Sequence, residues 1–164
     1  MSQKNFVVIL LGANLGDKRK MFSTVETYIE QHIGNCIKKS ALYASKAWGF
    51  ESDDEFYNQA LIVETEFSAH DTLLRCQAIE NKCGRVRHEQ SGYESRTIDI
   101  DLLYYNNDIV DYDDLVIPHP LLHKRRFALV PLCEIIPEYI HPILQKSNKT
   151  LLEECTDESI VKPV

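Results

Sequence analysis

The apolar side chains of this chain follow two different periods, and the order in which these periods alternate constrains the fold more than any other feature. Segments with a period of two, typical of β-strands, alternate with segments that have the wider spacing of amphipathic helices. The resulting order is β-α-β-β-α-β-β-α, and its first six elements match the split βαβ order of ferredoxin-like folds. We therefore expect an α+β, ferredoxin-like fold with a mostly antiparallel sheet flanked by helices. The expected strands are residues 5–11, 36–44, 57–67, 97–105 and 109–111.

Capping residues and glycines mark the ends of the expected helices. Asp17 and Ser68 are suited to cap helix N-termini, and Gly34 and Gly84 end those two helices. A third helix is expected near residues 121–130, interrupted by Pro131. We further expect loops at 45–55 and 85–95, a hairpin turn at 106–108, and at most a short helix near 150–155 in a weakly patterned tail from 143 onward.

Composition limits the class of protein. With 164 residues, of which 44% are hydrophobic and 26% charged, the chain fits one soluble domain spanning residues 1–164. The net charge of −7 argues against a general nucleic-acid binder, because non-specific affinity comes from neutralised phosphates. The cysteines are odd in number, at five, and include no C-x-x-C pair, which argues against a disulfide framework and favours a reducing compartment and a cytoplasmic protein. The apolar run 6–11 is too short to span a membrane.

Two aspartates at alternate positions of one apolar run carry the clearest chemical signal. Strand alternation places Asp99 and Asp101 on one face, and Ile98, Ile100 and Leu102 on the other. Residues two apart on a strand are separated by roughly 6.5–7 Å, which allows the two carboxylates to share a pair of hard cations. Mg²⁺ is typically held by one or two carboxylates together with substrate phosphates. The alternative is a strand with one solvated face, although aspartate is a poor strand former.

Basic residues near this pair are suited to a polyphosphate. Arg85 and Arg87 flank a predicted loop that ends at Arg96, and arginines so placed can fold over phosphates with bidentate hydrogen bonds. His119, between two prolines, and Arg125 offer further anion ligands. Each cluster taken alone is equally compatible with a solvated surface.

A second set of residues could bind a flat heterocycle. Aromatic side chains would stack on its faces, and an amide would hydrogen-bond to its edge. The alternative is that these residues simply fill the core. The set consists of Ser45, Trp48, Phe56, Asn58 and Phe127.

The turn expected at residues 12–16, after the first strand, excludes two common nucleotide sites. It lacks the Gly-Lys-Ser/Thr ending of a P-loop and the G-x-G-x-x-G order of a dinucleotide site. Any nucleotide must therefore be held by another architecture.

Taken together, these segments resemble the 6-hydroxymethyl-7,8-dihydropterin pyrophosphokinases, and the resemblance runs from Gly12 to about Pro137. Each segment alone could arise by chance, but their order and spacing together are specific. The segments are Gly12-Ala13-Asn14-Leu15, Phe56-Tyr57-Asn58, Glu80 with Gly84-Arg85-Val86-Arg87, Arg96 through Asp101, Pro118-His119, and Arg125-Arg126-Phe127 with Leu129-Val130-Pro131-Leu132.

The resemblance implies an activity and a set of roles. The family transfers pyrophosphate from ATP to the hydroxymethyl group of the dihydropterin and releases AMP, with two Mg²⁺ ions. By resemblance, Asp99 and Asp101 would bind the metals, and Arg85 and Arg96 would be catalytic. Gln77, Glu80, Arg87, Leu115, His119 and Arg125 would contact ATP, while Ser45, Trp48, Phe56, Asn58 and Phe127 would contact the pterin, with Phe56 and Phe127 on either side of its ring.

The chain departs from the family pattern at several places, including Ala13, where the family commonly has serine, and the segment 88–95, which is slightly longer than in some members. The pterin loop, usually proline-rich, reads Ser45-Lys46-Ala47-Trp48-Gly49. Where the family often has Trp-x-Pro before the second loop arginine, this chain has Tyr93, which we expect to cover the pterin instead. Asp114 stands where some members have an arginine near the nucleotide.

Two other readings remain open at this point. Nucleotidyl cyclases and polymerase palms also carry paired aspartates on related sheets, and they release pyrophosphate instead of AMP. A non-catalytic ferredoxin-like module, for instance for RNA, would need a basic surface, which the net charge of −7 disfavours. We expect a monomer with two small-molecule partners, ATP and a dihydropterin, and neither nucleic acid nor membrane as a partner.

Overall fold

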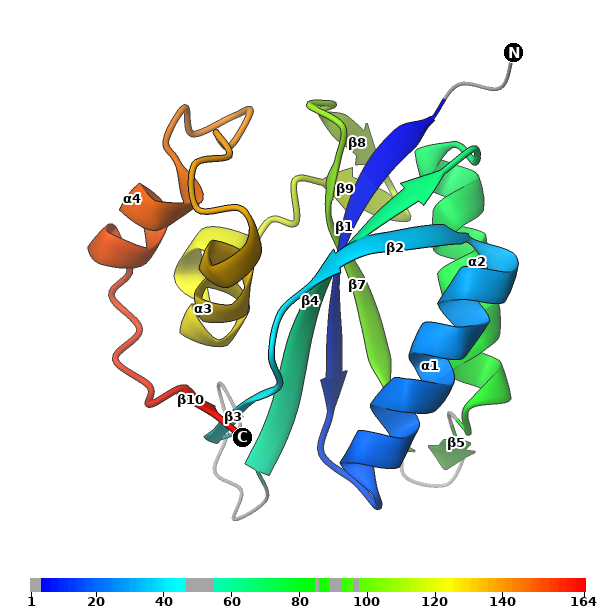
Figure 1. The fold of residues 1–164 in the computed structure, drawn as a ribbon. Coiled ribbons are helices and arrows are strands. Elements are labelled where there is room, and N and C mark those ends of the chain that lie inside the picture. Colours follow the sequence, from blue (N-terminus) through cyan, green and yellow to red (C-terminus); the bar gives the residue numbers. More distant parts are fainter. Residues whose placement is uncertain (1–3, 47–54, 85, 89–92, 96–97) are drawn as a thin grey trace.

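The computed structural model describes residues 4–46, 55–84, 86–88, 93–95 and 98–164, with the backbone alone for 86–88 and 93–95. Within these residues, one antiparallel sheet has helices on both faces (Figure 1). The strand order is β10-β3-β4-β1-β7, and β2 also pairs with β4. The strands of this sheet are β1 (Asn5–Ala13), β2 (Gly34–Lys39), β3 (Tyr43–Lys46), β4 (Glu55–Thr65), β7 (Asp99–Tyr105) and β10 (Lys162–Pro163).

The helices form two layers around the sheet. α1 and α2 cover one face, and α3 and α4 cover the other (Figure 1). Two short hairpins, β5 with β6 and β8 with β9, lie outside the main sheet. The bounds are α1 (Lys18–His32), α2 (Ala69–Lys82), β5 (Val86–His88), β6 (Tyr93–Ser95), β8 (Val110–Tyr112), β9 (Leu115–Ile117), the 3-10 helix η1 (Leu122–Lys124), α3 (Arg126–Ile135) and α4 (Asn148–Glu154).

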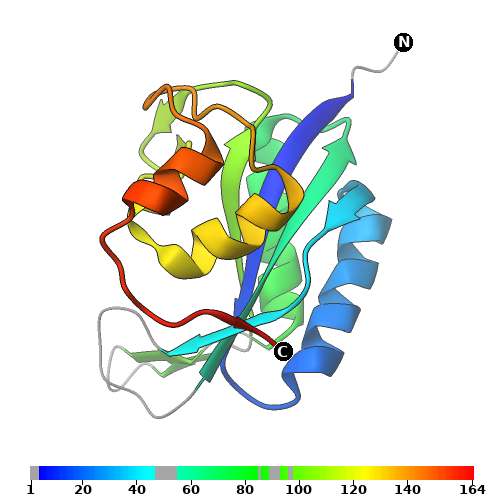
Figure 2. The same cartoon turned by 60° about the vertical axis from the view of Figure 1, so that its left-hand side comes forward.

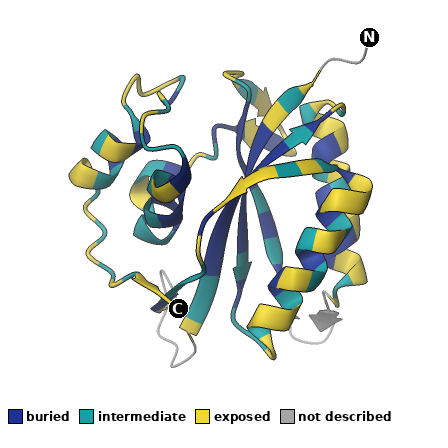
Figure 3. Ribbon diagram, in the orientation of Figure 1, coloured by how far each residue is buried: buried dark blue, intermediate teal, exposed yellow. Residues whose placement is uncertain are grey.

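The predicted fold class is confirmed, and the central strand explains why. β1 pairs with β4 on one side and with β7 on the other, both antiparallel. Val7 and Ile9 belong to the core beneath α1 and α2, while Val8 and Leu10 belong to the core beneath α3. The continuous apolar run of β1 is therefore buried on both faces, and Figure 3 shows the middle of the sheet as the most buried part of the molecule.

The helix ends follow the predicted capping pattern. The side chain of Asp17 accepts a hydrogen bond from Lys20 N, and that of Ser68 accepts one from Asp71 N. At the start of β2, a Cβ on Gly34 would lie 2.0 Å from Glu64 O. Only glycine allows β2 to approach β4 this closely.

The expected strand 36–44 is in fact two strands. β2 ends at Lys39 and β3 begins at Tyr43. Ser40 between them is buried, its Oγ accepts a hydrogen bond from Ala60 N, and its carbonyl oxygen accepts one from Gln59 Nε2. A serine side chain replaces the backbone ladder here, which periodicity alone does not reveal. Ser45 and Lys46, expected in the loop 45–55, belong to β3. Residues 47–54 of that expected loop lie outside the described part of the chain.

The hairpin expected between residues 97–105 and 109–111 does not form. β8 pairs with the unpredicted strand β9 and not with β7. The end of β7 is tied instead to β1, because Asn106 N donates to Phe6 O at 2.7 Å and Phe6 N donates to Asn106 Oδ1 at 2.8 Å. These bonds hold the turn residues against β1, and the chain continues to a separate hairpin.

The third helix also differs from the prediction. Residues 122–124 form a 3-10 turn, and α3 begins at Arg126 and runs through Pro131 to Ile135. Pro131 lies on the buried side of α3 with Leu132 and Ile135. Burial of this apolar face compensates for the helical hydrogen bond that proline cannot donate.

Smaller differences complete the comparison with the prediction. The described parts of residues 85–95, expected as a loop, contain β5 and β6. The tail forms α4, close to the short helix expected near 150–155, and the unpredicted strand β10. No helix in the described residues is long and apolar enough to cross a membrane.

Tyr104 connects β7 to the α3–α4 layer and provides a test of this packing. Its side chain is 1% exposed, and its hydroxyl donates to Asn148 Oδ1 at 2.6 Å. Tyr104→Phe leaves that buried amide oxygen without its donor, so we expect the free energy of unfolding to fall by about 1–3 kcal/mol. Urea unfolding of this variant and of Tyr112→Phe, a change at a 65% exposed side chain, provides the measurement and its control. Equal stabilities of the two variants would contradict the assignment.

Candidate active site

The two aspartates of β7 lie on the sheet face that α3 covers. Asp101 is opposite Leu10 of β1, and Asp99 is opposite Gly12. Cross-strand partners share a face, and Leu10 belongs to the core beneath α3. Both aspartates are partly buried, while Ile100 between them is buried in the core beneath α1 and α2. The predicted separation of carboxylates from apolar side chains along this strand is therefore confirmed.

A β-bulge in β7 contributes to this placement. Tyr104 is opposite Val8, but Leu102 is opposite Ile9, so Leu103 is an extra residue in β7. Leu103 and Tyr104 consequently both belong to the core beneath α3. The alternation then resumes with Leu102 on the α1–α2 side.

Glu80 of α2 holds the strand between the two aspartates. Its side chain is 6% exposed, and its Oε2 accepts a hydrogen bond from Ile100 N at 2.9 Å. The bond connects the end of α2 to the segment of β7 that carries Asp99 and Asp101. A carboxylate acceptor makes such a bond stronger than one between neutral groups.

A row of residues across three strands continues the site. Gly12 lies opposite Asn58 on β4 and opposite Asp99 on β7. A Cβ on Gly12 would lie 2.8 Å from Asn58 Nδ2, so glycine leaves the room that the amide occupies. Asn58 is 5% exposed and donates to Leu11 O at 3.3 Å. Asn58 and Asp99 therefore flank the end of β1 on the same face.

β3 adds a buried hydroxyl beside this row. Ser45 lies opposite Phe56, and Tyr43 lies opposite Asn58. Ser45 is 5% exposed, and within the described residues its Oγ has no hydrogen-bond partner. Buried hydroxyls are normally hydrogen-bonded, so this atom is suited to bind a polar ligand.

The start of α3 brings Arg125 and Phe127 to the same face of the sheet. Arg125 precedes the helix, and its guanidinium carbon lies 5.6 Å from the centre of the Phe127 ring. Phe127 packs at the margin of the core that contains Leu10 and Ala60. A residue predicted to contact ATP and one predicted to contact the pterin are thus adjacent.

A cavity of about 280 Å³ beside β7 joins three of the predicted site residues, Asp101, Leu115 and His119. Leu115 lies on β9, and His119 follows that strand. His119 is held by its backbone N–H, which donates to Leu103 O at 3.0 Å, and by its Nδ1, which accepts from Leu121 N at 3.2 Å. Burial, together with a smaller effect of the positive charge of Arg125, lowers the pKa of His119 to about 4. His119 is therefore neutral at neutral pH.

Asp113 and Asp114 also line this cavity, which the sequence did not predict. Asp114 accepts a hydrogen bond from His70 Nε2 at 2.7 Å, and this bond lowers the pKa of the carboxyl. The residue that departs from the family pattern at this position is thus connected to α2. The sequence signal for Asp114 was its position where some family members have an arginine near the nucleotide.

The donor set fits a metal that also binds the substrate. Within the described residues, no group of three or more His, Cys, Asp or Glu side chains could hold an ion. Asp99 and Asp101 alone are two carboxylates, which suits Mg²⁺ because this ion completes its octahedron with phosphate oxygens and water.

For the remaining predicted site residues, the described side chains show no contact with the aspartate pair or with the cavity beside it. Gln77 is exposed on α2. Trp48, Arg85 and Arg96 lie outside the described residues. Arg87 and Tyr93 lie on β5 and β6, opposite Glu94 and His88, and only their backbone is described.

A larger groove, of about 470 Å³, lies between α1 and β2, away from the aspartate pair. Its carboxylates already have partners: Glu30 Oε1 accepts from Cys36 N at 2.9 Å, and Glu26 Oε2 pairs with Lys39 Nζ at 3.1 Å. The smaller cavity beside Asp101 contains three of the predicted site residues and the larger groove contains none, so the smaller cavity is the stronger candidate site.

The family model for 7,8-dihydro-6-hydroxymethylpterin-pyrophosphokinase matches residues 8–137. The chain belongs to this family. A 2-amino-4-hydroxy-6-hydroxymethyldihydropteridine pyrophosphokinase from Aquifex aeolicus is 37% identical over 157 residues, which cover 96% of this chain and 94% of that protein. Membership makes this chain a pyrophosphokinase.

Some members of the pyrophosphokinase family carry the matching region within a longer protein. The folic acid synthesis protein FOL1 of Dictyostelium discoideum is 41% identical over 142 residues, which cover 85% of this chain but 21% of that protein. The HPPK-DHPS structure from Plasmodium falciparum with pteroate has a TM-score of 0.79 at 16% identity and covers 94% of this chain and 45% of that one. This structural likeness supports the fold.

The low pKa of His119 predicts a pH dependence of stability. In the unfolded chain histidine binds its proton near pH 6.5, whereas folded His119 does so only near pH 4. The unfolded state therefore binds more protons between these values, and stability is lost as pH falls from about 6.5 to 4. His119→Gln should reduce the loss between pH 7.5 and pH 5 by about 1–2 kcal/mol.

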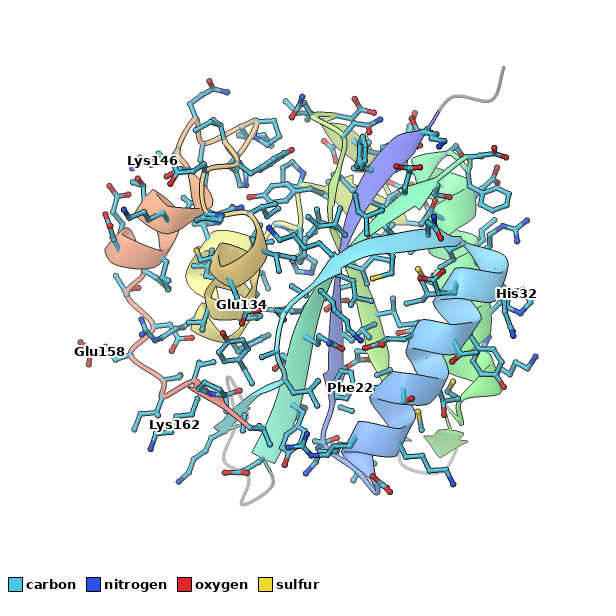
Figure 4. The ribbon with its side chains drawn as sticks, in the orientation of Figure 1. Phe22, His32, Glu134, Lys146, Glu158 and Lys162 are labelled. Carbon is cyan, nitrogen blue, oxygen red and sulfur yellow. The ribbon has the colours of Figure 1, made fainter. Side chains whose placement is uncertain are left out.

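Urea unfolding of both proteins at the two pH values measures this difference. His32→Gln is the control, because His32 is exposed on the outer surface of α1 (Figure 4). A pH dependence that is the same in all three proteins would show that His119 is not responsible.

Proposed function

We propose that this chain transfers the β,γ-pyrophosphate of ATP to the hydroxymethyl group of 6-hydroxymethyl-7,8-dihydropterin, releasing AMP, as a step of folate biosynthesis. The observation that carries the proposal is the common placement of Asp99, Asp101 and Asn58 on the α3 face of the sheet. The carboxylates of Asp99 and Asp101, which would bind a metal-bound polyphosphate, lie on the same face of the sheet as the buried amide of Asn58, which would bind a heterocycle. Both substrates are thereby brought to one end of the sheet.

Asp99 and Asp101 are the residues that would hold Mg²⁺. When bound, the ions supply positive charge that neutralises the phosphates and orients them for in-line displacement. The contribution of the chain is to fix the two carboxylates, and Glu80 does so through Ile100 N.

The cavity beside Asp101 is proposed to receive the nucleoside part of ATP. Leu115 and His119 line it, and neutral His119 can hydrogen-bond without adding charge beside Arg125. Arg125 and Arg87 would pair with phosphate oxygens. Gln77 and Glu80 are proposed to complete this set from α2.

The pterin is proposed to bind where β3, β4 and α3 meet. Ser45 Oγ and the Asn58 amide would hydrogen-bond to the edge of the ring, and Phe56 and Phe127 would cover its two faces. The buried Ser45 hydroxyl supports this assignment, because a ligand would supply the partner that the described residues do not. Trp48 and Tyr93 are assigned to the same substrate by resemblance.

The chemical step requires a new bond between the pterin hydroxyl oxygen and the β-phosphorus. The bond from the β-phosphorus to the oxygen shared with the α-phosphorus breaks, the hydroxyl proton is lost, and AMP leaves. Arg85 and Arg96 are proposed to stabilise the charge on the transferring group. Catalysis then depends on positioning and electrostatics, without a covalent intermediate.

We also propose that residues 1–164 form one pyrophosphokinase domain, which acts as a cytoplasmic monomer. Its partners would be ATP and the dihydropterin, with no nucleic acid and no membrane. The length supports the single domain, the cysteine pattern supports the cytoplasm, and the net charge of −7 argues against a nucleic-acid partner.

Removal of either carboxylate is expected to abolish turnover. Asp101→Ala and Asp99→Ala should each reduce AMP release by at least about a thousandfold, because metal stabilisation of the transition state contributes several kcal/mol. Thermal unfolding should remain cooperative in both variants. The assay incubates ATP, Mg²⁺ and 6-hydroxymethyl-7,8-dihydropterin with the protein and separates AMP from pyrophosphate.

Asp111→Asn, at an exposed position on β8, is the control for loss of one negative charge. Normal AMP release by Asp101→Ala would overturn the metal assignment. Release of pyrophosphate in place of AMP by the unaltered protein would overturn the proposed reaction in favour of a cyclase-like or polymerase-like one.

Loss of a loop arginine is expected to affect the rate more than binding. Arg96→Ala or Arg85→Ala should lower kcat at least about a hundredfold, because these groups are assigned to the transition state. The dissociation constant of a non-hydrolysable ATP analogue should change less than about threefold. Single-turnover kinetics and calorimetry provide the two values, with Arg19→Ala on the exposed side of α1 as control. A purely affinity-based loss would contradict the catalytic assignment.

A further inference from the structure

Residues 155–164 form an extended strap that crosses the molecule from α4 to the edge of the sheet (Figures 1 and 2). The strap lies beyond residues 8–137, the part that the family model matches. Its sequence has no hydrophobic period that would predict a position. In the structure, however, it contacts α3 and β3, two of the segments that carry proposed pterin residues.

The first contact is at the start of α3. Asp157 Oδ2 accepts a hydrogen bond from Arg126 N at 3.1 Å. Arg126 is the first residue of α3 and stands between Arg125 and Phe127. The residue at the N-cap position, Arg125, makes no side-chain capping bond. Asp157 thus provides the cap from a distant part of the chain.

The carboxylate of Asp157 is itself held in place. Its Oδ1 accepts hydrogen bonds from Ser159 N, at 3.0 Å, and from Ser159 Oγ. Partial burial alone would raise the pKa of Asp157, but the hydrogen bonds from Ser159 and from Arg126 N outweigh it and keep the pKa below its usual value. The group is therefore an ionised acceptor that is already oriented toward α3.

The second contact is with β3. In β10, Lys162 lies opposite Ala44 and Pro163 opposite Tyr43, and Val164 N donates to Leu42 O at 2.9 Å. β3 is consequently an inner strand of the sheet, between β10 and β4. Ser45 follows directly after the paired residues.

α3 and β3 are also joined directly, at the far end of the helix. Glu134 accepts hydrogen bonds from Tyr43 Oη at 2.6 Å and from Ala41 N at 3.0 Å. Figure 4 shows Glu134 on α3 close to β3, with Lys162 further along the strand edge. Glu134 thus links β3 to the C-terminal end of α3. The strap links β3 to the N-terminal end of the same helix, where Phe127 lies.

We propose that the strap is a positioning element for the pterin pocket, with Asp157 as its positioning residue at α3 and β10 as its anchor on β3. It fixes the spacing between Phe127 on the helix and Ser45 on the strand. The proposal rests on the proposed assignment of these two residues to the pterin. The strap contributes no group that touches a substrate.

Two variants release the strap at different ends. A chain that ends at Val161 lacks β10, and Asp157→Ala removes the cap on α3. Asp157→Asn is the conservative variant, because it keeps a side-chain oxygen that can accept from Arg126 N. Glu158→Ala is the matched control, because Glu158 is exposed and points away from the body of the molecule (Figure 4).

Calorimetric titrations with the pterin, in the presence of Mg²⁺ and a non-hydrolysable ATP analogue, measure the effect. We expect the dissociation constant of the pterin to rise about five- to twentyfold in the shortened chain and in Asp157→Ala. Asp157→Asn should bind the pterin with most of the original affinity. In the shortened chain the dissociation constant of the ATP analogue should stay within about twofold of the original, because β10 pairs with β3, at the opposite end of the strand order from β7 with its two aspartates.

Thermal unfolding separates positioning from stability alone. If both release variants melt at a lower temperature but, when folded, bind the pterin as Glu158→Ala does, the proposal is wrong. Should the shortened chain not fold, Asp157→Ala and Asp157→Asn decide the question by themselves.

The same titration with Phe127→Ala and Ser45→Ala tests separately whether these two residues bind the pterin at all, which the strap proposal assumes. If both bind the pterin normally, the pocket is elsewhere and the strap proposal fails with it. If they bind weakly while the release variants bind normally, the pocket assignment stands and only the strap proposal fails.

Discussion

The two-sided burial of β1 is the constraint from which the rest of the site is positioned. Its side chains alternate between two separate cores, so the strand can neither rotate nor slip by one residue without moving apolar groups from one core to the other. The pairings with β4 and β7 are then fixed, and they place Asn58 and Asp99 on either side of Gly12. The geometry of the site is in this sense a consequence of hydrophobic packing some distance away.

The two helical layers contribute different groups to the site. α1 and α2 pack against the face that carries Ile100 and Leu102, and α2 also supplies Glu80 to the backbone of β7. The opposite layer begins with Arg125 and Phe127 and therefore supplies charge and an aromatic surface. The positive charge of Arg125 lies near a neutral histidine, His119, and Asp101 lines the same cavity as this histidine. A cation and a carboxylate proposed to bind metal are thereby brought close together on an acidic chain.

The sequence predicted those parts of the structure that repeat a pattern. β1, β4, α1 and α2 each bury one or two regular faces, and Asp99 and Asp101 interrupt such a pattern in a way that identifies their face. Prediction failed where one long-range bond decides the outcome. Ser40 replaces a ladder bond with its side chain, Asn106 holds its turn against β1, and Asp157 caps a helix from 31 residues away. None of these bonds has a period or a neighbouring motif that would reveal it.

The bulge at Leu103 has a consequence for any attempt to transfer this site. Without the extra residue, regular alternation from Tyr104 would turn Asp101 and Asp99 toward α1 and α2, into an apolar interior that cannot solvate them. The orientation of the carboxylate pair is thus set by an irregularity two residues beyond it. A designer who grafts the pair onto another antiparallel sheet must also graft the bulge, since regular alternation along the strand would otherwise turn both carboxylates to the opposite face.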